Sequence, residues 1–199
     1  MNRKNKIIIR VVLVLILVVC WTWRYISLNQ FYDSISDVES AVFQMGQNVP
    51  FEDDRIGGYS QAEGYFICVD SFRIEEYEAY VESNDISFER PFAAPEKIAL
   101  VSVTLSNSTS EAEGVMLIDL QLHGIDNYVG MDWEMLYALN PILEGNPGIR
   151  LPHNTEVQLV LPFDLYRNYF GSFTWNNLSD YEWFLRVTAW PTEKDIRVQ

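Results

Sequence analysis

The order of apolar and polar positions divides the chain into three parts, and the first is a continuous apolar stretch. Residues 7–26 read IIIRVVLVLILVVCWTWRYI, and the 13 residues from Val11 to Trp23 carry no charge. Twenty helical residues rise roughly 30 Å, about the hydrocarbon thickness of a bilayer. The pattern therefore predicts one transmembrane helix over residues 7–26.

The residues around this stretch predict its orientation. Arg10 and Arg24 lie near its ends, where their side chains can reach the headgroups, and Trp21 and Trp23 suit the interface. The basic amino-terminal side predicts a cytoplasmic tail over residues 1–6 and an extracellular carboxyl-terminal part. Bulky residues where a signal peptidase needs small ones favour a permanent anchor. A cleaved signal peptide and a lipoprotein attached at the cysteine of the stretch are the alternatives.

The second part has helical periodicity. Apolar residues recur three or four positions apart: Leu28, Phe31, Ile35, Val38, Val42 and Met45. This spacing predicts a juxtamembrane stalk helix over residues 27–46, which packs on its own domain or, as the alternative, on a second copy. Residues 47–63 contain a proline, an acidic cluster and paired glycines, so we expect a linker there.

The third part, residues 64–199, alternates with a period of two. Seven segments have the pattern of strands: 65–72, 97–108, 115–123, 128–137, 157–163, 181–190 and 196–198. A short acidic helix or, as the alternative, an irregular excursion is expected over residues 75–82. Short strands without crossover helices between them predict a mainly β fold, and their number favours an immunoglobulin-like antiparallel β-sandwich.

Two segments of this part carry a family resemblance. KIALVSVTLSNST, from Lys97, and WFLRVTAWPTEKDIRV, from Trp183, follow an anchor and a short spacer. Together they resemble small membrane-anchored surface proteins of Gram-positive bacteria that carry one immunoglobulin-like domain of unknown function. The resemblance covers roughly residues 64–199. It implies a fold and a location at the cell membrane, and it carries over no site residue.

Charge excludes one class of partner. Beyond Arg24 the chain has nine basic and 28 acidic residues, a formal charge of −19. Phosphate binding needs the opposite sign, so nucleic acid is excluded as a partner. The two cysteines, Cys20 in the apolar stretch and Cys68 in a strand, are not expected to pair. An extracellular domain without disulfides fits a Gram-positive bacterium.

Candidate catalytic and metal-binding chemistry is sparse. His123 is expected on the solvated face of a strand and His153 in a loop, and no zinc-protease, phosphate-loop or dinucleotide motif accompanies them. The cluster Glu52-Asp53-Asp54 lacks the spacing of a calcium loop, which favours a solvated loop. We therefore expect no enzyme, no cofactor and no metal site.

Aromatic residues in a loop are the best candidates for a binding surface. Tyr169, Phe170, Phe173 and Trp175 lie between two predicted strands, as does the proline- and glycine-rich segment 141–154 elsewhere. The sequence thus predicts an extracellular interaction module that binds a protein, peptide or wall component, and an accessory or immunity factor of an export system is one such role. A carboxylate-based surface hydrolase and a calcium-dependent adhesion domain are the alternatives.

Overall fold

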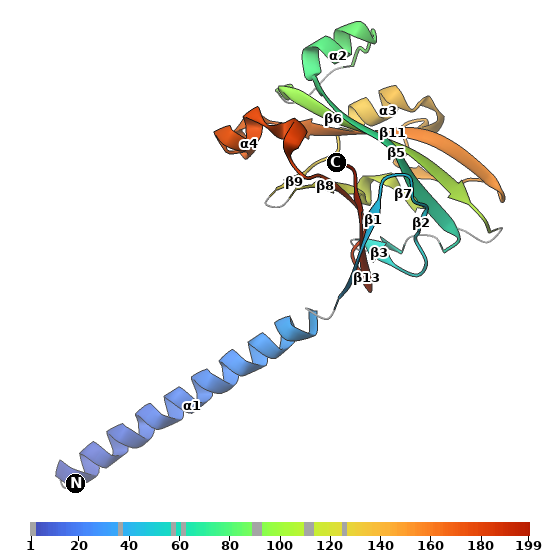
Figure 1. Cartoon of the computed structure of the whole chain (residues 1–199). Coiled ribbons are helices and arrows are strands. Elements are labelled where there is room, and N and C mark those ends of the chain that lie inside the picture. Colours follow the sequence, from blue (N-terminus) through green and yellow to red (C-terminus); the bar gives the residue numbers. More distant parts are fainter. Residues whose placement is uncertain are drawn as a thin grey trace. The chain divides into compact units, whose positions relative to one another are not determined.

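The amino-terminal unit is a single helix. The computed structural model describes residues 3–35, 38–56, 59–60, 63–88, 93–109, 114–124 and 127–199, which form two compact units, Met1–Val38 and Glu39–Gln199. Helix α1 spans Arg3–Ile35 and includes the predicted apolar stretch (Figure 1). Within the described residues, no helix combines the length and the apolar character needed to cross a membrane.

The predicted stalk helix is wrong in its second half. Strand β1 (Glu39–Gln44) pairs in parallel with the last strand, β13 (Thr192–Arg197). Phe43 on β1 packs against the core, whereas Val42 beside it is exposed. Backbone pairing with a strand from the far end of the chain overrides the local helical spacing, which sequence periodicity alone could not anticipate.

The predicted linker is also wrong, because its residues are part of the folded unit. It contains the short strands β2 (Val49–Pro50), β3 (Arg55–Ile56) and β4 (Tyr59–Ser60). Val49 and Phe51 are fully buried, which gives this segment apolar contacts with the core. The folded domain therefore begins at Glu39 and not at residue 64.

Two main sheets make the domain (Figure 1). One has the order β11-β6-β5-β2 and is dominated by three long strands: β5 (Tyr65–Glu76), β6 (Lys97–Asn107) and β11 (Thr155–Leu165). The other has the order β1-β13-β12-β8-β9 and adds the short strands β8 (Gln121–His123), β9 (Tyr128–Val129) and β12 (Phe184–Thr188). Strands β7 (Val115–Met116) and β10 (Gly148–Ile149) form a separate antiparallel pair.

The core lies between the two main sheets. Leu105 and Leu161 from the first sheet and Leu185 and Ile196 from the second belong to one buried cluster, together with Trp183. Alternating inward side chains of two facing sheets are the defining feature of a sandwich. The mainly β sandwich prediction is confirmed, with nine strands in the main sheets of the described chain. The immunoglobulin-like assignment stays a prediction.

Two predicted strands are interrupted by helical turns. In the segment 115–123, the 3₁₀ turn η1 (Leu117–Asp119) separates β7 from β8. In the segment 128–137, β9 ends at Val129 and helix α3 (Trp133–Leu139) begins soon afterwards. Both segments alternate in sequence, but in each the tertiary context overrides the strand pattern.

The remaining elements largely follow the predictions. Helix α2 (Tyr77–Ser83) confirms the short acidic helix, and η3 (Arg167–Tyr169), α4 (Ser172–Asn176), η4 (Leu178–Asp180) and η2 (Pro141–Leu143) fill connections. Pro162 does not stop its strand, because β11 is at the edge of its sheet and tolerates a missing donor. The last strand, β13, lies between β12 and β1 and is therefore not an edge strand.

Candidate functional site

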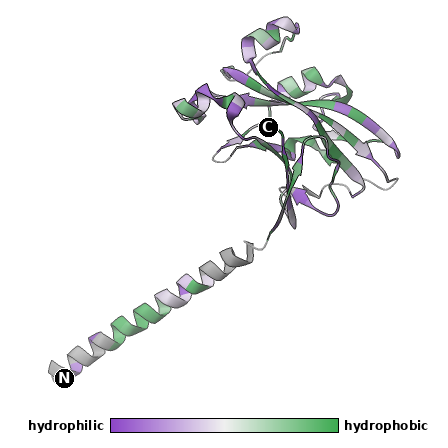
Figure 2. Ribbon diagram, viewed as in Figure 1, coloured by the Kyte–Doolittle hydropathy of each residue, from purple (hydrophilic) through white to green (hydrophobic). Residues whose placement is uncertain are grey.

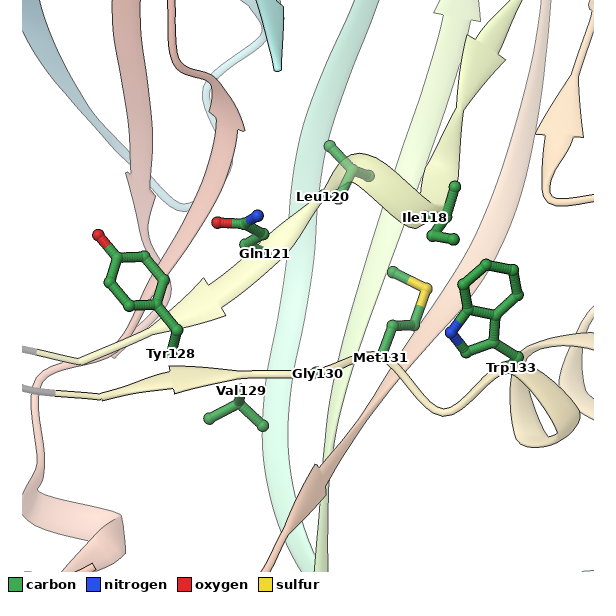
Figure 3. A pocket seen from close by; sticks show the side chains of 8 residues that line it. All are labelled: Ile118, Leu120, Gln121, Tyr128, Val129, Gly130, Met131 and Trp133. Carbon is green, nitrogen blue, oxygen red and sulfur yellow. The ribbon is translucent and has the colours of Figure 1, made fainter. Parts of the chain in front are cut away.

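A pocket of about 510 Å³ opens where the β8–β9 hairpin meets the start of α3 (Figure 3). Eight residues line it: Ile118, Leu120, Gln121, Tyr128, Val129, Gly130, Met131 and Trp133. This volume lies within the range of protein pockets that hold small molecules or single side chains. The lining is mostly apolar and aromatic, and its polar side-chain groups are the Gln121 amide, the Tyr128 phenol and the Trp133 indole N–H.

Strand alternation and the η1 turn arrange these side chains. Tyr128 points away from the core side of β9 while its neighbour Val129 is buried, as expected for successive strand residues. The η1 turn brings Ile118 toward Met131 and Trp133, so these three gather at one end in Figure 3. Gln121 and Tyr128 lie together at the other end.

Gly130 leaves the floor of the pocket open. A Cβ atom built on this residue would have no heavy atom within 4 Å outside its chain neighbours, and its φ lies outside the positive region that requires glycine. Its carbonyl oxygen accepts a hydrogen bond from the Asp164 backbone N–H (3.1 Å), which ties the segment to β11. The backbone here is therefore held in place and remains accessible to a ligand.

The cap of α3 fixes Trp133. Asp132 is buried, and its Oδ1 accepts a hydrogen bond from the Met135 backbone N–H at 3.0 Å. Its own backbone N–H donates to the Pro162 carbonyl of β11 at 3.0 Å. These two bonds hold the first turn of the helix, so the half-exposed indole of Trp133 has a rigid backbone beneath it.

A charged network supports Tyr128 at the other end. Arg186 on β12 donates from Nη1 to the Tyr128 hydroxyl oxygen (3.1 Å) and, through Nε and Nη2, to both carboxylate oxygens of Asp195 (3.0 Å each). It also pairs with Glu193 at 2.9 Å. Bidentate contacts of this kind fix a guanidinium in one orientation. The hydrogen bond from Arg186 therefore fixes the Tyr128 hydroxyl, although the tyrosine ring is exposed to solvent.

His123 joins this network, and its predicted solvated position is wrong. The ring is buried and stacks between Tyr128 and Phe184, with centroid distances of 5.3 and 5.5 Å. Its Nε2 lies 3.2 Å from Asp195 and its Nδ1 lies 3.1 Å from the Gly124 carbonyl oxygen. Both nitrogens face protein oxygen atoms, so neither is directed at the pocket.

The pKa of Asp195 reflects these partners. Burial acts to raise it, but the His123 and Arg186 side chains lower the pKa of Asp195 below its ordinary value of 3.8. Burial likewise acts to lower the pKa of Arg186, but the hydrogen bond and charge of Asp195 raise it. Both groups are therefore charged across the physiological range. No local sequence signal identifies this network, because its members come from four separate strands, β8, β9, β12 and β13.

A second charged cluster lies on the opposite face of β13. Lys194 is only 3% exposed, and its Nζ donates to the Pro50 carbonyl oxygen at 2.9 Å and pairs with Glu52 and Asp54. Asp54 is buried and also accepts from the Thr192 backbone N–H at 3.0 Å. The predicted solvated acidic loop is thus wrong at Asp54. Among the described residues, no group of three His, Cys, Asp or Glu side chains could hold a metal ion.

The four predicted binding residues separate into two pairs. Tyr169 and Phe173 are 64% and 83% exposed, whereas Phe170 and Trp175 are buried. The buried pair packs with Trp183, since the Phe170 ring lies 5.9 Å from Trp175 and 6.1 Å from Trp183. Only the exposed pair can contribute to a binding surface. The pocket described above draws on none of the four.

The predicted anchor residues lie on α1. Arg10, Trp21, Trp23 and Arg24 are all exposed, and the Trp21 ring stacks on Tyr25 with a centroid distance of 5.6 Å. Their assignment as interfacial residues stays a prediction. Cys20 also lies on this helix and Cys68 on β5, and neither cysteine is disulfide-bonded.

Comparisons with known proteins give a family and a set of distant structures. The family described as "Domain of unknown function (DUF5028)" matches residues 40–194. No curated protein matches the sequence.

The structures that resemble this chain are all remote in sequence. An uncharacterized beta-sandwich protein from Clostridium difficile 630 is 9% identical, with a TM-score of 0.41 over 81% of this chain and 97% of that one. The yjhA protein from Bacillus subtilis is 10% identical, with a TM-score of 0.38 over 77% and 99% of the two chains. A functionally unknown protein from Listeria monocytogenes EGD-e is 10% identical, with a TM-score of 0.38 over 70% and 76%.

Proposed function

We propose a binding role for this chain, which belongs to the DUF5028 family of domains of unknown function. The domain acts as an interaction module outside the cell membrane, and its pocket receives an apolar side chain of a protein or peptide. The observation that carries the proposal is the pocket with exposed Tyr128 and Trp133 at its two ends. Aromatic side chains held on a rigid backbone are the usual anchors of a binding surface.

The lining favours binding over catalysis. None of the eight lining residues is a carboxylate, a histidine, a serine or a cysteine. Hydrolysis of a glycosidic bond needs two carboxyl groups facing one substrate, and acyl transfer needs a nucleophile beside a base. The nearest histidine, His123, has both nitrogens directed at protein oxygens. We therefore propose recognition in preference to a surface hydrolase.

A protein or peptide suits the pocket better than a wall polysaccharide. Sugars present many hydroxyl groups, and the lining side chains offer only the Gln121 amide, the Tyr128 hydroxyl and the Trp133 indole N–H to pair with them. A calcium-dependent contact is also disfavoured at Glu52 and Asp54, since both carboxylates already pair with the Lys194 ammonium.

Attachment to a membrane is part of the proposal. Along α1 the residues Val12–Val19 are each 48% to 68% exposed, and Figure 2 colours this stretch as strongly hydrophobic. A helix that is apolar on every side is expected in lipid rather than in water. Extraction of cell membranes with alkaline carbonate tests this part: we expect the chain to stay in the pellet, and release into the supernatant contradicts it.

Selection of peptides tests the pocket directly. A random twelve-residue peptide library is selected on the full chain in detergent micelles and, in parallel, on Gly130→Trp, which fills the open floor of the pocket. Gly171→Trp is the matched control, because a Cβ there also meets no atom within 4 Å. We expect sequences that are enriched on the wild type and on Gly171→Trp but are lost on Gly130→Trp. Identical enrichment on all three proteins would overturn the proposed pocket.

A further inference from the structure

We propose that the side chains of Lys194 and Asp54 condense to an amide bond, which cross-links the first part of the domain to its last strand. The Lys194 Nζ is the nucleophile, the Asp54 Cγ is the electrophile, and Glu52 carries a proton between them. The inference is independent of the proposed binding role, because none of the three residues lines the pocket. Three observations carry it: a buried lysine beside a buried aspartate, a carboxylate oxygen without a hydrogen bond, and a second carboxylate on the same amine.

Both reacting side chains are shielded from water. Lys194 on β13 is 3% exposed, and Asp54, directly before β3, is 2% exposed. The Lys194 Nζ lies 2.5 Å from the Asp54 Oδ2. Two charges removed from water carry a large desolvation penalty, and an amide removes both charges at once. An amine fixed beside a carboxyl group also reacts as part of one molecule, which lowers the entropic barrier to condensation.

The two oxygens of Asp54 differ in their contacts. Oδ1 accepts a hydrogen bond from the Thr192 backbone N–H at 3.0 Å. Oδ2 is buried and has no hydrogen bond within the described residues, although the Lys194 nitrogen is so close. The nitrogen therefore does not approach this oxygen along a hydrogen-bond direction. Condensation would release Oδ2 as water and keep Oδ1 as the amide oxygen, so the atom without a hydrogen bond is the one that leaves.

The other contacts of the Lys194 Nζ orient it for attack. It donates to the Pro50 carbonyl oxygen at 2.9 Å and to the Glu52 Oε2. A neutral amine has two N–H groups and one lone pair. With its two N–H groups directed at Pro50 and Glu52, the lone pair is left to face the carboxyl group of Asp54.

Glu52 is held in a position that suits a proton carrier. Its φ is 54°, a left-handed conformation that residues other than glycine rarely adopt. Backbone strain of this kind is typical of residues whose side chains must reach a particular site. The side chain is 61% exposed while its Oε2 contacts the buried amine. Glu52 therefore connects the reacting nitrogen to solvent.

The reaction balances without another reactant. A proton passes from the Lys194 ammonium to the Asp54 Oδ2, which gives an amine and a carboxylic acid. The Nζ lone pair attacks Cγ, and the negative charge of the tetrahedral intermediate lies on Oδ1, where the Thr192 N–H stabilises it. Glu52 then takes a second proton from Nζ and delivers it to the Oδ2 hydroxyl, which leaves as water when the C–O bond breaks. Nζ keeps one hydrogen, and no atom is oxidised or reduced.

The bond would restrain the domain as a disulfide does. It joins a residue next to β3 to β13 and closes a loop that contains most of the domain, which lowers the entropy of the unfolded chain. Neither Cys20 nor Cys68 is disulfide-bonded. An amide cross-link needs no oxidant, so it would form in any redox environment.

The mass of the intact chain tests the inference. We expect the purified full chain to be lighter than its sequence mass by about 18 Da, the mass of one water. Lys194→Arg keeps the positive charge but has no primary amine, so it should show its full mass. Lys97→Arg is the matched control, because Lys97 also pairs with a carboxylate, that of Glu76, and it should keep the deficit. Circular dichroism verifies that both variants fold.

A tryptic map of the wild type locates the bond without any variant. Trypsin does not cleave after an acylated lysine, so Lys194 should stay inside the peptide 187–197. That peptide should appear joined to the peptide 25–55, which contains Asp54. Fragmentation of the branched product should place the link between Asp54 and Lys194.

Glu52→Gln tests the proton carrier. The amide should form about 100-fold more slowly, so that unlinked chain accumulates and converts on incubation. A linked fraction equal to that of the wild type would contradict the role of Glu52.

Two further outcomes would overturn the cross-link. One is a wild-type chain at its full sequence mass with peptides 25–55 and 187–194 recovered separately. The other is a mass deficit that persists in Lys194→Arg, which would place the modification elsewhere. Each leaves the peptide selection at the pocket unaffected, so failure of this inference and failure of the proposed function are distinguishable.

Discussion

Two neighbouring residues of β13, Lys194 and Asp195, are the centres of two charge clusters with opposite arrangements. Lys194 is a buried cation between Glu52 and Asp54, whereas Asp195 is a buried anion between Arg186 and His123. Because successive residues of a strand point to opposite faces, the two clusters lie on different sides of one sheet. Adjacent residues of one strand therefore belong to two separate ion-pair clusters.

The two clusters also differ in the parts of the domain that they contact. The Lys194 cluster fixes the segment around residues 50–54 against β13 and reaches no lining residue of the pocket. The Asp195 cluster continues through Arg186 to the Tyr128 hydroxyl, which lines the pocket. We therefore expect the first cluster to affect stability alone and the second to affect both stability and ligand binding.

The largest effect is expected for Lys194→Met. Removal of the cation leaves Asp54 buried without a charge partner, and breaking a buried pair in this way costs about 3–5 kcal/mol. Chemical denaturation of the full chain in micelles measures the free energy of unfolding. Arg73→Met, which removes an exposed pair with Glu75, is the control and should cost less than about 1 kcal/mol. Equal losses for the two variants would show that the Lys194 cluster contributes no more than a surface pair.

Asp195→Asn should have the next largest effect. It removes two charge-assisted bonds from Arg186, and we expect a loss of about 2–3 kcal/mol because Glu193 still pairs with the guanidinium. Loss of the Arg186 orientation should also weaken the selected peptide about threefold, whereas Lys194→Met should leave its Kd unchanged in the folded protein. Isothermal titration with both variants makes the comparison. A changed Kd for Lys194→Met would contradict the expectation that the Lys194 cluster affects stability alone.

The stability conferred by Asp195 should depend on pH. Its pKa is lower in the folded chain than the ordinary value of 3.8, so the unfolded chain binds more protons as the pH falls toward that value. Stability therefore declines with falling pH, and the contribution of the carboxylate is fully present only above that value. Thermal melts of the wild type and Asp195→Asn should differ most near pH 7 and converge as the pH falls below the lowered pKa of Asp195 in the folded chain. A constant difference would mean that the charge of Asp195 is not what stabilises the fold.

The smallest effect, and of opposite sign, is expected for Asp119→Asn. Burial without a cation raises the pKa of Asp119 above 3.8, so its charged form disfavours the folded state at neutral pH. The Asn variant should melt at a slightly higher temperature near pH 7, and the gain should vanish in acid, where the aspartate is protonated. A lower melting temperature near pH 7 would contradict this account.

Sequence periodicity predicted the long strands but missed the short strands β2, β3 and β4. Apolar residues alternate at Val101, Val103 and Leu105 in β6, which pairs along its length with β5 and β11, so pattern and structure agree there. The segment 128–137 alternates as well, but the Asp132 side chain caps a helix at Trp133. An aspartate three residues before a helical N–H was the available signal, and strand periodicity obscured it.

The pocket and its network could not be found from local sequence. Ile118 and Trp133 meet only because a 3₁₀ turn and a helix cap interrupt two predicted strands. His123 was expected on a solvated face because its strand alternates, and its burial depends on Asp195 and Phe184 near the end of the chain. Composition did identify aromatic residues as binding candidates, but it favoured a segment in which Phe170 and Trp175 serve the core.

The pairing of β1 with β13 has a mechanical consequence. The first strand of the domain follows α1 directly in the chain and runs parallel to the last strand through six residue pairs, from Glu39 with Thr192 to Gln44 with Arg197. In a parallel pair, tension applied at the start of one strand and the end of the other loads the whole ladder in shear. All the backbone bonds of the pair must then yield together rather than one after another. Tension transmitted through α1 is therefore resisted by the parallel β1–β13 hydrogen bonds at the first strand of the domain.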